Sequence, residues 1–279
     1  MADDPGSSFK RPDDKYLEGL KQFWRSLWYD KHDPFCDVAV LRGSDPIDSV
    51  DVPANMKVLQ LPEILSSLGN VMVRSDYEEA IEDFGKTSYR QNNSVIIVGH
   101  PGIGRTVRSV GQAAFLIYAS PCPGKTILLY YILVKRLLDR KPTILQTQRQ
   151  YLYSFHSEGV DVLSQSSPIL PNSEEYRNTW ALVDINVHVQ APAELISHEN
   201  SPFYLVMSSS PKPSRMRELK KYGRPGAYWL MNPFTLVELL QASVFLTSIS
   251  SFVTYVMSQS STSRRSLQKL QGVRYSEVF

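Results

Sequence analysis

The spacing of apolar residues near the start of the chain predicts an amphipathic helix over residues 16–28. Six apolar side chains recur there three or four positions apart and share one face: Leu17, Leu20, Phe23, Trp24, Leu27 and Trp28. We expect this aromatic face to dock against the body of the protein, and the alternative is that it binds a membrane surface or a partner. With a short strand that follows, the helix forms a small N-terminal α+β extension over residues 1–71.

From residue 72 onward, the pattern predicts helices that alternate with strands. Ser75 stands where its hydroxyl can cap the start of a helix. Three acidic residues follow it in the first turn, where they favour the positive end of the helix dipole. A β-branched run at 94–98 ends on glycine, as a buried parallel strand does when it enters a loop. Further apolar runs predict strands at 143–146, 151–155, 180–184 and 203–207. This order is typical of an α/β fold with a mainly parallel sheet flanked by helices.

The glycine-rich segment after residue 98 carries the first half of a phosphate-binding loop. Such a loop has the pattern G-x-x-x-x-G-K-[ST] between a strand and a helix. Its backbone amides surround phosphate, its lysine reaches the outer phosphates, and its hydroxyl binds magnesium. Gly99, Gly102 and Gly104 fit the glycine half, but Arg105 stands where the lysine belongs. Arginine is larger and planar, so it is not a neutral replacement in a tight loop.

The second half of the pattern lies further along the chain. Lys125 and Thr126 follow Gly124 and run directly into an apolar helix that ends in basic residues before Pro142. Removing residues 105–124 would join Gly104 to Lys125 and give strand, complete loop and helix in order. We therefore expect residues 105–124 to be an insertion, such as a translated intron or an error of gene prediction. The alternative is two unrelated Gly-Pro turns.

An acid follows the apolar run at 180–184, which is the form of a strand whose aspartate holds the magnesium shell in phosphate-loop ATPases. Asp184 is therefore the candidate catalytic and metal-binding acid, together with Thr126. Many such ATPases have a glutamate next, which orients water, whereas Ile185 and Asn186 follow here. The sequence thus leaves hydrolysis open. Ser208, Ser209 and Ser210 end the next apolar strand, and a hydroxyl there either senses the outer phosphate or simply enters a loop.

The order of these parts resembles the P-loop NTPase domains of Crinkler-type and retrotransposon-hotspot-type proteins, which are related to AAA+ and STAND ATPases. The resembling segments are VRSDYEEAI, SVIIVGHPGIG with KTILLYYILVKRLL, WALVDIN, FYLVMSSSP and YWLMNPFTLVELL. The resemblance implies a P-loop NTPase-like domain at 72–240, with a truncated C-terminal lid because a Ser-rich tail occupies 241–279. It also implies a Walker A site for ATP and Mg²⁺, with phosphate contacts from Gly99, Gly102, Gly104, Lys125 and Thr126 and metal contacts from Thr126 and Asp184.

The composition of the chain limits the ligands, partners and cellular compartments that we expect for it. A formal net charge of +2 gives no reason to expect nucleic acid. Cys36 and Cys122 lack metal-ligand spacing, so we expect no zinc and a reducing compartment. The opening residues are acidic and polar, unlike a secretory signal, and we expect an intracellular, cytoplasmic or nuclear protein. Residues 239–257 carry no charge but many Ser and Thr, so we do not expect them to span a membrane.

These patterns lead to one main hypothesis and two alternatives. The first is a nucleoside-triphosphate-binding module, with ATP as the nucleotide, which acts as an ATPase if the insertion is absent. For the chain as written we expect weak or no binding, because the two ends of the insertion compete for the same space. The second is an inactive NTPase-like scaffold that binds a partner through its aromatic N-terminal helix, or self-associates. The third is a defective gene-model product.

Overall fold

The structure is a computed structural model of the chain. It describes residues 13–37, 57–66, 69–86, 94–99, 123–164, 178–186, 188–198, 201–209, 226–232, 235 and 238. The chain forms two compact units, one of residues 1–36 and 57–233 and the other of residues 37–56 and 234–279. The second unit is described only at three residues. Two of these, Thr235 and Glu238, exchange side-chain to backbone hydrogen bonds of 2.8 and 3.1 Å, as in a capping box.

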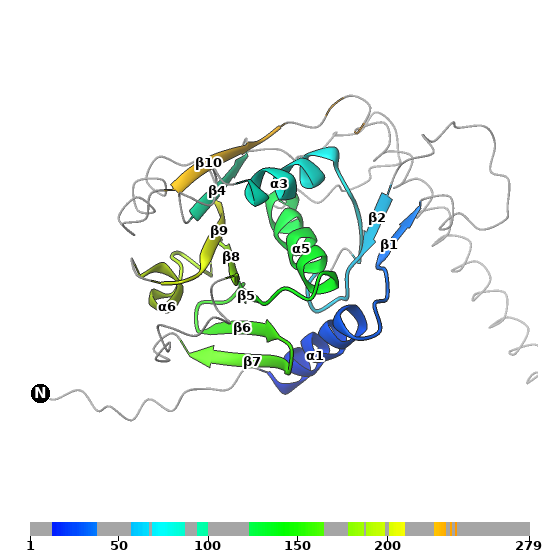
Figure 1. The fold of residues 1–279 in the computed structure, drawn as a ribbon, viewed down its shortest axis with the longest axis vertical. Coiled ribbons are helices and arrows are strands. Elements are labelled where there is room, and N and C mark those ends of the chain that lie inside the picture. The colour runs from blue at the N-terminus through cyan, green and yellow to red at the C-terminus, as the bar shows by residue number, and fades with distance from the viewer. Residues whose placement is uncertain are drawn as a thin grey trace, which may run out of the picture. The chain divides into compact units, whose positions relative to one another are not determined.

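A seven-stranded sheet is the centre of the first unit (Figure 1). Its strands lie in the order β10-β4-β9-β8-β5-β6-β7, and the five from β10 to β5 are parallel. The last two, β6 and β7, continue the sheet as an antiparallel hairpin. The strand bounds are β4 (Ser94–Gly99), β5 (Thr143–Gln146), β6 (Tyr151–His156), β7 (Gly159–Ser164), β8 (Trp180–Asp184), β9 (Tyr204–Ser209) and β10 (Gly226–Met231). The prediction of an α/β fold with a mainly parallel sheet is confirmed.

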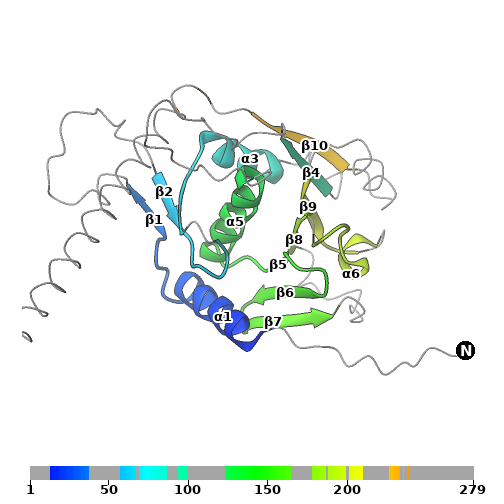
Figure 2. The same ribbon diagram turned by 180° about the vertical axis from the view of Figure 1, so that it is seen from behind.

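Helices cover both faces of this sheet (Figure 1 and Figure 2). Helix α5 (Pro123–Leu138) contacts β4, β5, β8 and β9 on one face. The short helix α6 (Glu194–Ser197) packs on the other face, where Ile196 shares a core with Ala181 and Val183 of β8. Side chains alternate along a strand, so Leu182, which lies between these two, and Asp184 point toward α5.

Helix α1 (Asp14–Trp28) docks with its aromatic face inward, as its spacing predicts. Leu20, Leu27 and the rings between them are buried against α5 and the β6–β7 hairpin. The indole Nε1 of Trp24 donates to the carbonyl of His156 at 3.0 Å. Arg140, just beyond α5, donates from Nε to the carbonyl of Trp28 at 3.1 Å. The apolar face of α1 is thus part of the core of the first unit.

Helix α3 (Ser75–Gly85) follows a small three-stranded sheet of β1 (Phe35–Asp37), β2 (Lys57–Gln60) and β3 (Asn70–Met72). The prediction that Ser75 caps this helix is wrong, because Ser75 is its first residue and Arg74 takes the capping position without a side-chain cap. The first turn is held by other bonds. Asp76 accepts from the backbone N–H of Asn232 at 3.0 Å, and Arg74 donates to the carbonyl of Asn232 at 3.0 Å.

The helices of the described part of the chain are short or carry polar residues. None of its helices is both long enough and apolar enough to cross a bilayer. The uncharged stretch at 239–257 and the tail that contains it lie outside the described residues.

Candidate functional site

The candidate site lies at the edge of the sheet where the parallel strands end. Strands β4, β8 and β9 run in one direction, so Gly99, Asp184 and Ser209 terminate them at the same edge. Helix α5 begins at this edge, as the contact between Thr126 in its first turn and Asp184 demonstrates. In open α/β sheets the carboxyl ends of the strands are where ligands bind.

Asp184 is the centre of a hydrogen-bonded cluster. Thr126 Oγ1 lies 3.2 Å from each of its carboxylate oxygens, Ser208 Oγ donates to Oδ1 at 2.5 Å, and Asn186 Nδ2 donates to Oδ2 at 3.2 Å. Ser208 is the register partner of Asp184 on the neighbouring strand, so both side chains point to the α5 face. The structure therefore brings together Thr126 and Asp184, the two residues predicted to hold metal, and adds Ser208 to them.

Lys125 is buried beside this cluster, with only 3% of its surface exposed. Among the residues that the structure describes, none forms a hydrogen bond or ion pair with its ammonium group. A buried charge without an opposite charge is costly. Lys125 also lies in the first turn of a helix, where backbone N–H groups lack partners within the helix and favour anions. The burial of Lys125 and the helix end both point to an anionic ligand.

The start of α5 is held in place by α3. The hydroxyl of Tyr77 donates to the carbonyl of Gly124 at 3.2 Å. Pro123 occupies the first position of the helix, where its missing N–H costs nothing. The last two residues of the predicted insertion, Pro123 and Gly124, therefore belong to the helix that carries Lys125.

The glycine half of the predicted loop is described only at its first position. Gly99 is the last residue of β4 and pairs with Met231 of β10. Gly102, Gly104 and residues 105–122 lie outside the described residues. The predicted junction of Gly104 with Lys125 is therefore not described by the structure and stays a prediction.

The donor set suits magnesium better than a metal that needs several protein ligands. No group of three or more His, Cys, Asp or Glu side chains able to hold a metal occurs in the described ranges. Mg²⁺ requires only one or two carboxylates because phosphates and waters complete its octahedral shell. The hydroxyl of Thr126 and the carboxylate of Asp184 are oxygen ligands of this kind, so the residues fit the metal.

One neighbour of Asp184 was not among the predicted site residues. Tyr130 lies four positions after Thr126 and so on the same face of α5. Burial raises its pKa above the usual range, and the negative charges of Asp184 and of ionised Tyr16 raise it further. The spacing from Thr126 was the available signal, and it was missed because an aromatic residue in an apolar helix is normally a core residue.

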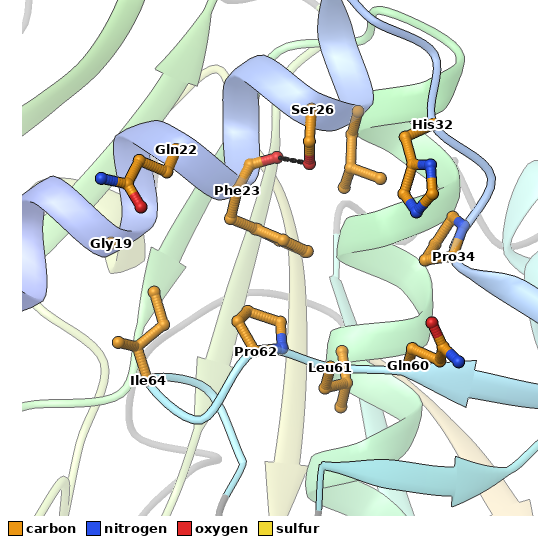
Figure 3. Close-up of a pocket in the computed structure, with 11 residues that line it drawn as sticks. Gly19, Gln22, Phe23, Ser26, His32, Pro34, Gln60, Leu61, Pro62 and Ile64 are labelled. Atoms are coloured by element: carbon orange, nitrogen blue, oxygen red, sulfur yellow. Dashed lines mark hydrogen bonds between the residues drawn. The ribbon is translucent and has the colours of Figure 1, made fainter.

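A separate pocket of about 430 Å³ lies between α1 and the segment that follows β2 (Figure 3). Its lining includes Phe23, Leu61 and Ile64 and, among the described residues, contains no Asp, Glu, Lys or Arg. The hydroxyl of Ser26 donates to the carbonyl of Phe23 at 2.8 Å, so this polar group is already satisfied within α1. His32 is the one titratable side chain among the described residues of this lining, and it has no acidic or basic partner there.

No protein-family model matches the sequence, and no curated protein matches it either. The resemblance to Crinkler-type and retrotransposon-hotspot-type domains therefore remains a prediction, which rests on the motifs of the chain.

Proposed function

We propose that the chain is a nucleoside-triphosphate-binding module of the P-loop type, related to AAA+ and STAND ATPases, with ATP as its nucleotide. The observation that carries the proposal is the start of α5. There a buried Lys125 without a described partner is followed by Thr126, whose hydroxyl contacts Asp184 on β8. The two residues that a phosphate loop contributes to its helix thus lie beside the acid that its metal needs.

Each of these residues has a chemical task in the proposal. The N-terminal backbone N–H groups of α5 and the ammonium of Lys125 would neutralise phosphate oxygens. Thr126 donates its single hydroxyl proton to Asp184, which leaves the oxygen lone pairs of Thr126 free for a cation. Thr126 and Asp184 would therefore hold Mg²⁺. When bound, the metal would withdraw charge from the phosphate oxygens.

Ser208 supports the same proposal from the neighbouring strand. Strand β9 lies between β4, which leads into the glycines, and β8, which ends at Asp184. A hydroxyl at the end of β9 is therefore in the middle of the edge where phosphate would bind. Its bond to Asp184 uses the one hydroxyl proton of Ser208 and fixes the carboxylate that would hold the metal, so Ser208 would act on the metal site through Asp184.

Hydrolysis has less support than binding. Ile185 follows Asp184 at the place where a water-orienting acid is expected, and the side chain of Asn186, the residue after it, is occupied. Its Oδ1 accepts from the backbone N–H groups of His188 and Val189 at 2.7 and 3.0 Å, and its Nδ2 donates to Asp184. We therefore propose ATP binding as the primary function, and ATP hydrolysis only for a chain that lacks residues 105–124.

Thermal unfolding with ATP and Mg²⁺ tests the proposal on two proteins, the full chain and the chain without residues 105–124. A ligand that binds only the native state at 100 times its Kd stabilises it by about 2.7 kcal/mol, which raises Tm by roughly 5–10 °C in a protein of this size. We expect a shift of this size in the shortened chain and a smaller shift, or none, in the full chain.

Lys125→Ala should abolish the shift. The matched control is Lys141→Ala, which removes an exposed lysine whose ammonium pairs with Asp139 at 2.7 Å and should leave the shift intact. If both proteins fold and neither responds to ATP, the phosphate-loop assignment is incorrect. The inactive scaffold would then be the remaining candidate, although it is less favoured because the aromatic face of α1 is buried within the chain.

A further inference from the structure

The peptide group between Gly124 and Lys125, at the start of α5, is bonded by a side chain of another helix. Helix α3 packs against α5 (Figure 1). From α3, the hydroxyl of Tyr77 donates to the carbonyl of Gly124 at 3.2 Å, across 47 positions of the chain. The bond is buried, and Tyr77 itself is 2% exposed. A side chain outside the motif therefore bonds the backbone of the residue that precedes Lys125.

This bond also constrains the backbone of Lys125. The carbonyl of Gly124 and the N–H of Lys125 belong to one planar, trans peptide group, so they point in opposite directions. N–H groups in the first turn of a helix lack partners within the helix and are available for an anion. A carbonyl that accepts a hydrogen bond also polarises its own peptide group, which makes the N–H a better donor. The Tyr77 hydroxyl thus acts on a donor that faces the proposed phosphate site.

Tyr77 is itself held in place by the edge of the sheet. Next to it in the first turn of α3, Asp76 accepts from the backbone N–H of Asn232 at 3.0 Å. Asn232 directly follows Met231, the last residue of β10, which pairs with Gly99 at the end of β4. The bond from Tyr77 therefore connects the start of α5 to the strand end where the glycine half of the motif begins.

We propose that Tyr77 is a positioning residue of the phosphate site, whose hydroxyl orients and polarises the peptide group before Lys125. The inference rests on the proposed nucleotide-binding function and assigns to it a residue that the phosphate-loop pattern does not contain. Tyr77 does not touch the nucleotide. It acts through the backbone N–H of Lys125, which donates to a phosphate oxygen when the nucleotide is bound.

Nuclear magnetic resonance tests the bond in the full chain without any ligand. Labelling glycine carbonyl carbons with ¹³C and lysine nitrogens with ¹⁵N selects Gly–Lys peptide groups, and the sequence contains two, Gly85–Lys86 and Gly124–Lys125. In Tyr77→Phe, loss of the hydrogen bond should move the carbonyl signal of Gly124 upfield. The signal of Gly85 is the internal control and should stay in place. An unmoved Gly124 signal would overturn the proposal.

The affinity for ATP tests the consequence of the bond. It is measured by calorimetry in excess Mg²⁺ for the full chain and for the chain without residues 105–124, in which Gly104 takes the place of Gly124 before Lys125. Where the wild type binds, Tyr77→Phe should raise the Kd about three- to ten-fold, as expected for one hydrogen bond. The amide signal of Lys125 should also move less on addition of ATP than it does in the wild type.

Tyr131→Phe is the matched control. The ring of Tyr131 lies 5.6 Å from that of Tyr77 and is equally buried, but its hydroxyl forms no hydrogen bond within the described ranges. This variant should leave the Kd and the Gly124 signal unchanged. An unchanged Kd in Tyr77→Phe, or an equal rise in Tyr131→Phe, overturns the role of Tyr77 and leaves the proposed function standing. If neither form of the wild-type chain binds ATP, both proposals are overturned.

Discussion

The hydroxyl oxygen of Thr126 has two tasks at the candidate site, a hydrogen bond to Asp184 and the proposed binding of a cation. It contacts both oxygens of Asp184 at 3.2 Å and retains lone pairs for a cation. In the chain without residues 105–124, we expect Thr126→Ser to keep Mg²⁺-dependent ATP binding and Thr126→Val, which has nearly the same shape, to weaken it at least about ten-fold. Calorimetry with Mg²⁺ and ATP measures both. Equal affinities for the two variants would contradict a metal-binding role for this hydroxyl.

Arg136 is a buried cation that we expect to serve stability alone. Its Nε donates to Thr143 Oγ1 at 2.9 Å, its Nη2 donates to two backbone carbonyls at 2.6 and 2.8 Å, and its guanidinium stacks on Trp180 at 4.5 Å. Lysine cannot reproduce this planar set of donors. Arg136→Lys should lower the unfolding free energy by about 2–3 kcal/mol in urea.

The exposed Arg140 offers a matched control for that substitution. It donates to one carbonyl, that of Trp28, so Arg140→Lys should cost no more than about 1 kcal/mol. Circular dichroism during urea unfolding reports both variants. Equal losses for the two substitutions would mean that the buried network around Arg136 contributes little.

The burial of Tyr131 and Tyr153 predicts a loss of stability in alkali. Burial raises the pKa of Tyr131 and of Tyr153 above the usual 10.0, with smaller contributions from Glu78 and from other tyrosines. Below pH 10 both tyrosines keep their protons in the folded and unfolded states, so their contribution is fully present. Above pH 10 the unfolded chain loses these protons first, and stability falls by about 1.4 kcal/mol per pH unit for each tyrosine.

Tyr131→Phe removes one of the two hydroxyl groups that lose a proton in the unfolded chain above pH 10. Its unfolding free energy should therefore fall less steeply between pH 10 and 11.5 than that of the wild type, by about 1.4 kcal/mol per pH unit. Urea unfolding at a series of pH values measures the slope. Identical slopes would show that Tyr131 ionises as easily in the folded protein as in the unfolded chain.

Among the elements, α1 takes the role that its spacing predicts, because its aromatic face docks against the body of the protein. Its aromatic face belongs to the core, and Trp24 also bonds the hairpin through the carbonyl of His156. Trp24→Ala should therefore lower the unfolding free energy by about 3–5 kcal/mol. Lys21→Ala, on the exposed face of the same helix, should change it by no more than about 0.5 kcal/mol. A small effect of Trp24→Ala would indicate that α1 is an appendage.

The strands that the sequence predicts best are those with long apolar runs. The predicted bounds of β5 and β8 agree with the structure, and β4 and β9 differ by one or two residues. Strand β7 was not predicted, because its sequence GVDVLS carries polar residues and is defined by pairing with β6. Helix α6 has four residues, too few for a periodic signal. Tertiary pairing and packing, rather than local pattern, define both elements.

The site was predictable to the same degree as its strands. Thr126 and Asp184 follow from motif and strand order, because parallel strands end at one edge, and the structure places them in contact. The neighbourhood of Tyr130 and Tyr16 was not predictable, since it depends on where α1 packs. Sequence spacing gives the residues on one face of a helix, whereas contacts between distant elements depend on the whole fold.

For the whole molecule, the contact between α5 and β8 has a consequence for the proposed insertion. The strand, the helix and the Thr126–Asp184 contact are all present in the full chain. Loop-closure entropy changes slowly with length, so removing residues 105–124 should alter the unfolding free energy without ligand by no more than about 2 kcal/mol. Urea unfolding of the two chains measures this difference. A shortened chain that fails to fold would show that these residues belong to the fold.

The four tryptophans give the two units different optical properties. Trp24, Trp28, Trp180 and Trp229 all lie in the first unit, each with 6% of its surface exposed, and the sequence of the second unit contains none. Their emission should lie at shorter wavelengths than that of indole in water, and should move to longer wavelengths when the first unit opens. Tryptophan fluorescence therefore does not report on the second unit. Comparing it with circular dichroism, which reports on both, would reveal whether the two units unfold together.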